Sequence, residues 1–183
     1  MERQTLRYEP TLEQRWKEGS LWKSWLKDYP KLFGGINGDL APYVEAQHRR
    51  GYFFPECLAA TYYHQKGLNV LIETYMPHGG MTPSQDKMGV VESLVGADNF
   101  HALQRMANPQ GTAFPGLLVW HDPADYFFVE VKKGNDRLSN EQRTMFEEIQ
   151  RLLGCRIEIL SLIPFTPLTL QGGFQQPKRK SKK

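Results

Sequence analysis

A glutamate and a lysine separated by one residue stand near the end of an apolar run, Tyr126-Phe127-Phe128-Val129-Glu130-Val131-Lys132-Lys133. Side chains alternate along a strand, so Glu130 and Lys132 point to the same face, and the carbonyl of Val131 lies between them. A carboxylate and a carbonyl are ligands for Mg²⁺, and a nearby lysine can steer a water molecule and offset negative charge. The pattern predicts metal-assisted hydrolysis of a phosphodiester.

The preceding run, Phe114-Pro115-Gly116-Leu117-Leu118-Val119-Trp120, predicts the paired strand of a β-hairpin. A carboxylate at position 116 would close the metal cluster, and the PD-(D/E)xK arrangement of nucleases needs Asp directly after Pro115. This chain has Gly116 instead. Asp122 and Asp125 are expected at the hairpin tip, roughly 20 Å away at ~3.3 Å per residue, so they cannot replace it.

The residues around Glu-x-Lys form a longer and more specific pattern. The string Glu130-Val131-Lys132-Lys133-Gly134-Asn135-Asp136-Arg137-Leu138-Ser139, with Gln142 after it, resembles the VRR-NUC domain family of PD-(D/E)xK nucleases. Within that family, the chain is most similar to the nuclease domain of the Fanconi-associated nuclease and its bacterial and phage relatives. Phe54-Pro55-Glu56-Cys57-Leu58-Ala59-Ala60 resembles the first-helix motif of that group. The resemblance spans about residues 52–163.

The resemblance implies a role for each matching residue. Glu56 is expected to bind a second metal or its water, Glu130 to be a direct metal ligand, and the carbonyl of Val131 to assist it. Lys132 is expected to position and activate the attacking water, and Gln142 to face the same pocket. Position 116 holds the metal-bridging Asp of the family, so Gly116 removes a ligand for the expected Mg²⁺ or Mn²⁺.

Three of these residues also have a purely structural interpretation. Glu56 could be a first-turn acid that interacts favourably with a helix N-terminus. Gln142 stands three residues after Ser139, so it completes a capping box whether or not it faces the site. Glu130 and Lys132 could form a surface ion pair, although the flanking string favours the catalytic interpretation.

The charge of the chain is unevenly distributed. The net charge is +3, but Lys178-Arg179-Lys180-Ser181-Lys182-Lys183 carries five positive charges, which leaves −2 for the rest. DNA contact is therefore expected from a local patch and the tail rather than from a general positive field. Arg49-Arg50 is equally consistent with a solvated charge run, and Asp136-Arg137 is more consistent with a loop salt bridge. The residues predicted to contact DNA are Arg49, Arg50, Lys133, Arg137, Lys178, Arg179 and Lys180.

The predicted elements combine helices and strands in the order of a mixed α/β fold. The predicted fold is restriction-endonuclease-like, with a central mixed β-sheet flanked by helices and an N-terminal helical extension. Residues 1–50 are expected to be that extension, residues 51–168 the nuclease domain, and residues 169–183 a disordered basic tail. Capping boxes are expected at Thr11 and Ser139. Helices are predicted over 11–28, 40–49, 55–66, 83–95 and 98–107 and from 139, and strands over 70–75, 117–121, 126–132 and 156–162.

Composition narrows the cellular setting. No apolar run resembles a membrane span or a secretory segment, so we expect a cytoplasmic protein of a bacterial or phage-infected cell, or one delivered into another cell. Cys57 and Cys155 lack metal-site spacing, and reduced thiols are expected over a disulfide. The tryptophans at 16, 22 and 25 are expected in the core rather than on a base-stacking platform.

Two classes of function follow from the sequence. The first is a Mg²⁺- or Mn²⁺-dependent DNA endonuclease, acting on branched or flapped DNA, in phage DNA processing or as an antibacterial toxin with an immunity or partner protein. The second is a nuclease fold that binds DNA or protein without cleaving. Asp and Gly codons differ by one base, and Glu56, Glu130, Lys132 and Gln142 are all present. The sequence therefore predicts a nuclease that Gly116 leaves inactive or nearly so.

Overall fold

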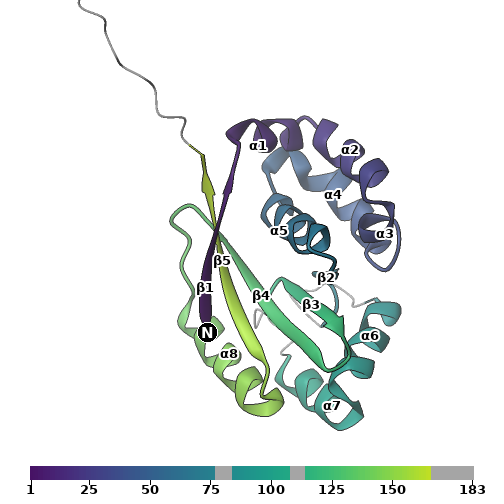
Figure 1. Cartoon of the computed structure of the whole chain (residues 1–183), viewed down its shortest axis with the longest axis vertical. Coiled ribbons are helices and arrows are strands. Elements are labelled where there is room, and N and C mark those ends of the chain that lie inside the picture. The colour runs from purple at the N-terminus through teal and green to yellow at the C-terminus, as the bar shows by residue number, and fades with distance from the viewer. Residues whose placement is uncertain (77–83, 108–113, 166–183) are drawn as a thin grey trace, which may run out of the picture.

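The computed structural model describes residues 1–76, 84–107 and 114–165. Its sheet has the order β1-β5-β4-β3-β2 (Figure 1). Strands β1 and β4 pair with β5 in parallel, and β3 pairs antiparallel with β4 and β2. This mixed sheet confirms the predicted restriction-endonuclease-like α/β class. The strands are β1 (Glu2–Tyr8), β2 (Asn69–Ile72), β3 (Leu117–Asp122), β4 (Asp125–Lys133) and β5 (Arg156–Pro164).

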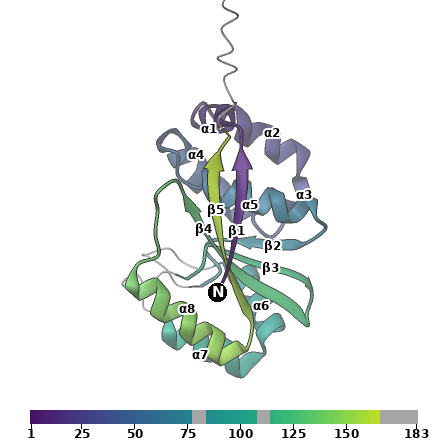
Figure 2. The ribbon, with the colours of Figure 1, turned by 60° about the vertical axis from the view of Figure 1, so that its left-hand side comes forward.

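Helices lie on both faces of the sheet. Figures 1 and 2 show α1 to α4 gathered at one end of the molecule and α6 to α8 at the other. The helices are α1 (Pro10–Lys17), α2 (Ser20–Asp28), α3 (Pro30–Phe33), α4 (Ala41–Gln47), α5 (Phe54–Gln65), α6 (Gln85–Val95), α7 (Ala97–Met106) and α8 (Asn140–Leu153). Two 3₁₀ turns, η1 (Gly38–Leu40) and η2 (His48–Arg50), flank α4.

The two faces of the sheet have separate hydrophobic cores because neighbouring side chains of a strand point to opposite faces. Val129 and Val131 of β4 belong to the core that α5 and the N-terminal helices cover. Phe128, which stands between Phe127 and Val129 in the chain, packs in the other core with Phe146 of α8. Glu130 has the same parity as Phe128, so its side chain lies on the α8 face.

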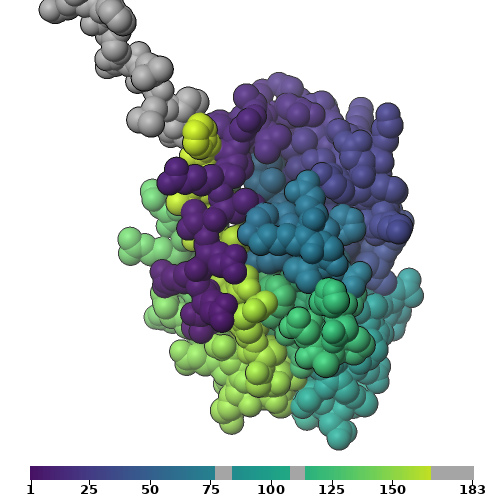
Figure 3. Space-filling view, in the orientation of Figure 1, coloured from purple at the N-terminus to yellow at the C-terminus, as the bar shows by residue number. Residues whose placement is uncertain are grey.

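The N-terminus differs from the sequence prediction. Helices alone were expected over residues 1–50, but Glu2–Tyr8 form β1, an edge strand in register with β5. Figures 2 and 3 show this strand beside β5 and open to the surface. Its outer positions carry Glu2, Arg3 and Arg7, and charged residues are typical of a strand that must not pair with another molecule. A polar edge strand has no apolar run by which the sequence would reveal it.

Element boundaries also differ in two informative places. The capping box predicted at Thr11 is wrong, since α1 begins at Pro10 with Glu9 as the N-cap, and the Glu9 side chain makes no capping hydrogen bond. The capping box at Ser139 is confirmed, with both of its hydrogen bonds present. Strand β2 ends at Ile72 rather than at 75, because Glu73 and Thr74 adopt positive φ angles of 46° and 49°.

The aromatic N-terminal helices form a packed cluster. Trp16, Trp22 and Trp25 are buried, which confirms their place in the core. Both cysteines are free thiols, Cys57 fully buried and Cys155 partly so. In the described part of the chain, no helix has the length and apolar character that a membrane crossing requires. The predicted tail, with Lys178, Arg179 and Lys180, lies outside the described residues.

Candidate active site

Three of the predicted residues meet on the α8 face of the sheet. Lys132 Nζ lies 2.8 Å from Glu130 Oε1, as the alternation along β4 predicts. Gln142 of α8 donates from Nε2 to the same Glu130 oxygen at 2.7 Å and accepts from Lys132 Nζ at 3.0 Å. Glu130 is 7% exposed. The closed triangle holds a buried carboxylate and an ammonium group at fixed positions.

Gln142 serves the helix and the site together. Its backbone N–H donates to Ser139 Oγ at 3.1 Å, and its side-chain Oε1 accepts from the Ser139 N–H at 3.2 Å. The same side chain joins Glu130 to Lys132. The capping box fixes the first turn of α8 against β4, so the two interpretations of Gln142 are compatible and both geometries are present.

Glu56 reaches the site from α5. It occupies the first turn of this helix, one residue after Pro55, and its Cγ lies 3.4 Å from the position that a Cβ on residue 116 would take. Burial, and then the negative charge of Glu130, raises the pKa of Glu56 to about 7. The carboxylates of Glu56 and Glu130 are therefore close enough to repel each other.

Gly116 has a second acidic neighbour that the sequence did not predict. A Cβ on residue 116 would stand 3.0 Å from Glu73 Oε1. The backbone N–H of Glu73 donates to the carbonyl of Gly116 at 2.9 Å. Burial first, and then the charges of Glu56 and Glu130, raise the pKa of Glu73 well above its usual range. A third carboxylate thus lies where the expected Asp is missing.

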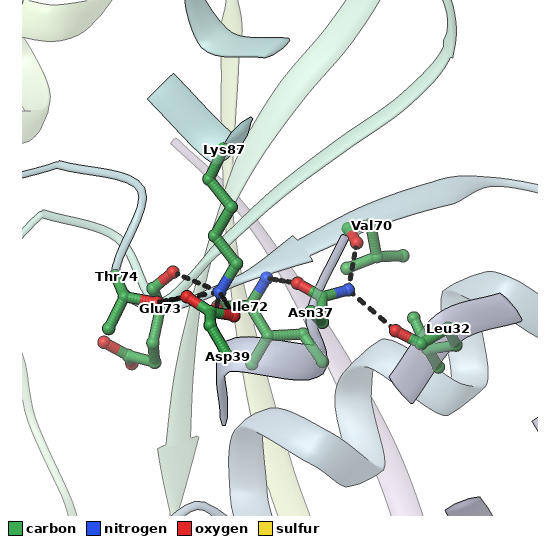
Figure 4. Close-up of polar contacts among 8 residues, drawn as sticks. All are labelled: Leu32, Asn37, Asp39, Val70, Ile72, Glu73, Thr74 and Lys87. Carbon is green, nitrogen blue, oxygen red and sulfur yellow. Dashed lines mark hydrogen bonds and ion pairs between the residues drawn. The ribbon is translucent and has the colours of Figure 1, made fainter. Parts of the chain in front are cut away.

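The strained backbone at Glu73 and Thr74 is held by a buried lysine. Lys87 Nζ donates to the carbonyl of Ile72 at 2.6 Å, to that of Glu73 at 3.1 Å and to Thr74 Oγ1 at 2.7 Å (Figure 4). Asp39 Oδ1 lies 2.9 Å from the same nitrogen. Lys87 is 0% exposed. Positive φ is costly for residues other than glycine, so these bonds determine where the Glu73 side chain begins.

A buried asparagine continues this support along β2. Asn37 Nδ2 donates to the carbonyls of Val70 and Leu32, and its Oδ1 accepts from the N–H of Ile72 at 2.9 Å (Figure 4). The free edge of β2 is therefore satisfied by a side chain instead of another strand. Pro115, directly before Gly116, is held as well, since the Tyr75 hydroxyl donates to its carbonyl.

A basic cleft of about 380 Å³ opens beside Lys132. It is lined by Arg3 of β1, by Arg137, which precedes α8, by Arg143 of α8, and by one acid, Asp136. The expected salt bridge between Asp136 and Arg137 is not among the ion pairs of the described residues. Three guanidinium groups next to the Glu–x–Lys motif are suited to phosphate oxygens. Arg3 was missed from sequence because it lies far from the motif along the chain, and Arg143 was missed although it directly follows Gln142.

The other predicted DNA contacts are more dispersed. Lys133 Nζ lies 2.9 Å from Glu13 Oε1, so a carboxylate of α1 already neutralises it. Arg49 and Arg50 are exposed on η2. Asp122 and Asp125 pair with each other at the exposed tip of the β3–β4 hairpin, away from Glu130, as expected.

The donor set suits a hard divalent cation. Glu130, Glu56 and Glu73 supply carboxylates, and Val131 supplies a carbonyl, which is the ligand chemistry of Mg²⁺ and Mn²⁺. Their mutual repulsion would be relieved by a cation. In the described ranges, no three acidic, histidine or cysteine side chains already surround one point as a finished metal centre.

The fold and the Glu–x–Lys hairpin define a nuclease core of the restriction-endonuclease type. The VRR-NUC domain model matches residues 63–161, more than half of the chain, so the protein belongs to the VRR-NUC domain family. Membership makes it a protein of nuclease type, with DNA as the implied substrate. Glu56 lies before the matched range, whereas Glu73, Glu130 and Gln142 lie within it. Among curated proteins, no sequence matches this chain.

Proposed function

We propose that this protein is a DNA endonuclease that depends on Mg²⁺ or Mn²⁺ and hydrolyses phosphodiester bonds. The observation that carries the proposal is the convergence of Glu130, Lys132 and Gln142 with Glu56 at the start of β3. These residues come from β4, α8 and α5, and Glu56 lies 74 positions before Glu130 in the chain. The VRR-NUC family match supports the same chemistry.

The metal would be held by Glu130, the Val131 carbonyl and Glu56. When bound, it supplies Lewis-acid activation of the phosphate and lowers the pKa of a water molecule. Lys132 positions that water and offsets the charge that develops on the phosphate. Gln142 holds Lys132 and Glu130 in register through its two side-chain bonds. Arg3, Arg137 and Arg143 bind phosphates of the strand that leads to the site.

Branched or flapped DNA is the proposed substrate, in phage DNA processing or in an antibacterial toxin with an immunity or partner protein. These settings follow from the sequence resemblance. The basic cleft supports contact with a DNA backbone, because its three arginines face solvent beside Lys132. Phosphate contacts position a duplex without reading its sequence, so structure rather than base sequence is the expected basis of selection.

The alternative function is a nuclease fold that binds DNA or protein without cleaving it. Gly116 favours this alternative, because the carboxylate of the PD-(D/E)xK pattern is absent there. The prediction that Gly116 inactivates the chain assumes that no other carboxylate takes this place. The carboxylate of Glu73 lies beside that position, with Oε1 3.0 Å from the place of a Cβ on residue 116.

The test is cleavage of plasmid, flapped and four-way-junction DNA by the full chain with Mg²⁺, Mn²⁺ or EDTA. Lys132→Ala is the matched control, since it keeps the strand and removes the ammonium group. Metal-dependent cleavage that Lys132→Ala lacks supports the endonuclease. Tight DNA binding with no cleavage by the parent in any metal supports the binding module instead.

A further inference from the structure

We propose that Glu73 supplies the metal-binding carboxylate that residue 116 lacks, so that the site is complete with its ligand moved to the neighbouring strand. This inference rests on the proposed metal-dependent nuclease function and names a ligand that the sequence motif does not contain. A glutamate directly after β2 would then bind the metal in place of an aspartate directly before β3.

The first support is the space at residue 116. Glu73 Oε1 would be 3.0 Å from a Cβ on this residue, a contact closer than side chains normally accept. An Asp carboxylate begins one bond beyond its Cβ, so it would compete with Glu73 for the same volume. Glycine at 116 therefore does more than remove a ligand, because it leaves room for the carboxylate that arrives from β2.

The second support is the direct link between the two positions. The N–H of Glu73 donates to the Gly116 carbonyl at 2.9 Å. This bond continues the antiparallel β2–β3 ladder, in which Ile72 pairs with Leu117, by one residue. Positions 73 and 116 are therefore neighbours across the sheet, and a side chain from either one can enter the same site.

The third support is the strained turn that directs Glu73. Glu73 and Thr74 have φ angles of 46° and 49°, and left-handed backbone at two successive residues other than glycine persists only where its surroundings impose it. Lys87 imposes it here, with Asp39 as the counter-ion of its buried ammonium group. The cost is explained if the turn delivers a carboxylate to the site.

The closing experiment compares Mn²⁺ binding by titration calorimetry with Mg²⁺-dependent DNA cleavage in five full-length proteins. They are the parent, Glu73→Gln, Gly116→Asp, the double variant with both changes, and Glu147→Gln. Glu147 is exposed on α8, so its variant makes the same chemical change on the protein surface. Circular dichroism and thermal unfolding verify that each protein is folded.

Glu73→Gln is expected to weaken Mn²⁺ binding at least about tenfold and cleavage about a hundredfold. Gly116→Asp alone should give no gain, because its carboxylate is crowded and repelled by Glu73. The double variant should recover Mn²⁺ affinity over Glu73→Gln, and Glu147→Gln should match the parent. If Glu73→Gln does not fold, Glu73→Asp applies the same test, since its shorter arm should also lower Mn²⁺ affinity.

Parent-like Mn²⁺ affinity in Glu73→Gln overturns the role of Glu73, and cleavage by both proteins would leave the nuclease function standing. If the parent does not cleave DNA and Gly116→Asp does, the proposed role of Glu73 is also overturned. That result would show instead that Gly116 inactivates a nuclease. If the parent, Gly116→Asp and the double variant all bind no Mn²⁺ and cleave no DNA, the metal-dependent function fails together with the inference.

Discussion

Glu73 and Gly116 are joined by a backbone hydrogen bond of 2.9 Å, and the Glu73 carboxylate fills the space beside the glycine. The two residues are 43 positions apart in the chain and adjacent across β2 and β3. The Glu73 carboxylate can occupy this space only because residue 116 has no side chain. Its consequences, and those of the Glu130–Lys132–Gln142 triangle, can be measured.

Substitution of Lys132 and substitution of Glu130 should have different effects on cleavage and on metal affinity. Lys132→Ala is expected to lower cleavage at least about a hundredfold while Mn²⁺ affinity stays close to that of the parent, because the ammonium group offsets charge but binds no metal. Glu130→Gln should lose both cleavage and Mn²⁺ affinity. Calorimetry beside single-turnover cleavage separates the roles. Equal losses of metal affinity in both variants would contradict the assignment.

Gln142 should contribute to stability and to activity through different bonds. Gln142→Ala removes its part of the capping box and its bridge between Glu130 and Lys132. Ser139→Ala is the matched control, since it removes the Ser139 side-chain cap and leaves the bridge. Each is expected to lower the free energy of unfolding by about 1 kcal/mol in urea titrations, and Gln142→Ala alone should lower kcat. A similar kcat for both variants would restrict Gln142 to helix capping.

Lys87 should be a positioning residue on which the fold also depends. Lys87→Met leaves the carbonyls of Ile72 and Glu73 without their donor and Asp39 without its counter-ion. We expect a loss of about 3 kcal/mol in the free energy of unfolding. Asp39→Asn should cost less, because Asp39 is partly exposed. Measurement by denaturant titration should reproduce this order, and a Lys87→Met protein as stable as the parent would exclude the supporting role.

The basic cleft should bind the DNA backbone. Arg143→Ala and Arg3→Ala are each expected to weaken binding to all DNA sequences alike and to reduce the slope of log affinity against log salt by about 1. Arg15→Ala, on the exposed side of α1, is the control and should leave the slope unchanged. Fluorescence anisotropy at several salt concentrations provides the measurement. Parent-like slopes for both cleft variants would place the DNA elsewhere.

The basic C-terminal segment should add affinity without selectivity. Deletion of residues 174–183 removes five positive charges, and the salt slope should become shallower by up to about four units at ~0.9 per phosphate contact. The ranking of flapped, branched and linear DNA should be unchanged, because phosphate neutralisation carries no sequence information. A salt slope equal to that of the full chain would show that this segment does not contact DNA.

The amino-acid sequence determined the features that depend on local pattern. Alternation along β4 placed Glu130 and Lys132 on one face, and the spacing of Ser139 and Gln142 specified the start of α8. Apolar runs identified four of the five strands, β2 to β5, and the class of the fold. The motif string was enough to predict the family. These results are local because each follows from neighbouring residues and from the geometry of a single element.

Tertiary structure alone decided which distant residues share the site. The sequence predicts Glu73 as a strand residue, because nothing in Val70-Leu71-Ile72-Glu73 shows that the chain turns at positive φ or that β3 starts beside it. The one sequence signal for Glu73 is that an acidic residue directly follows the apolar run Val70-Leu71-Ile72. Arg3 was missed because β1 is a polar edge strand whose partner lies at the other end of the chain. Sheet register and the buried Lys87 network depend on contacts between segments far apart in sequence, which no local pattern encodes.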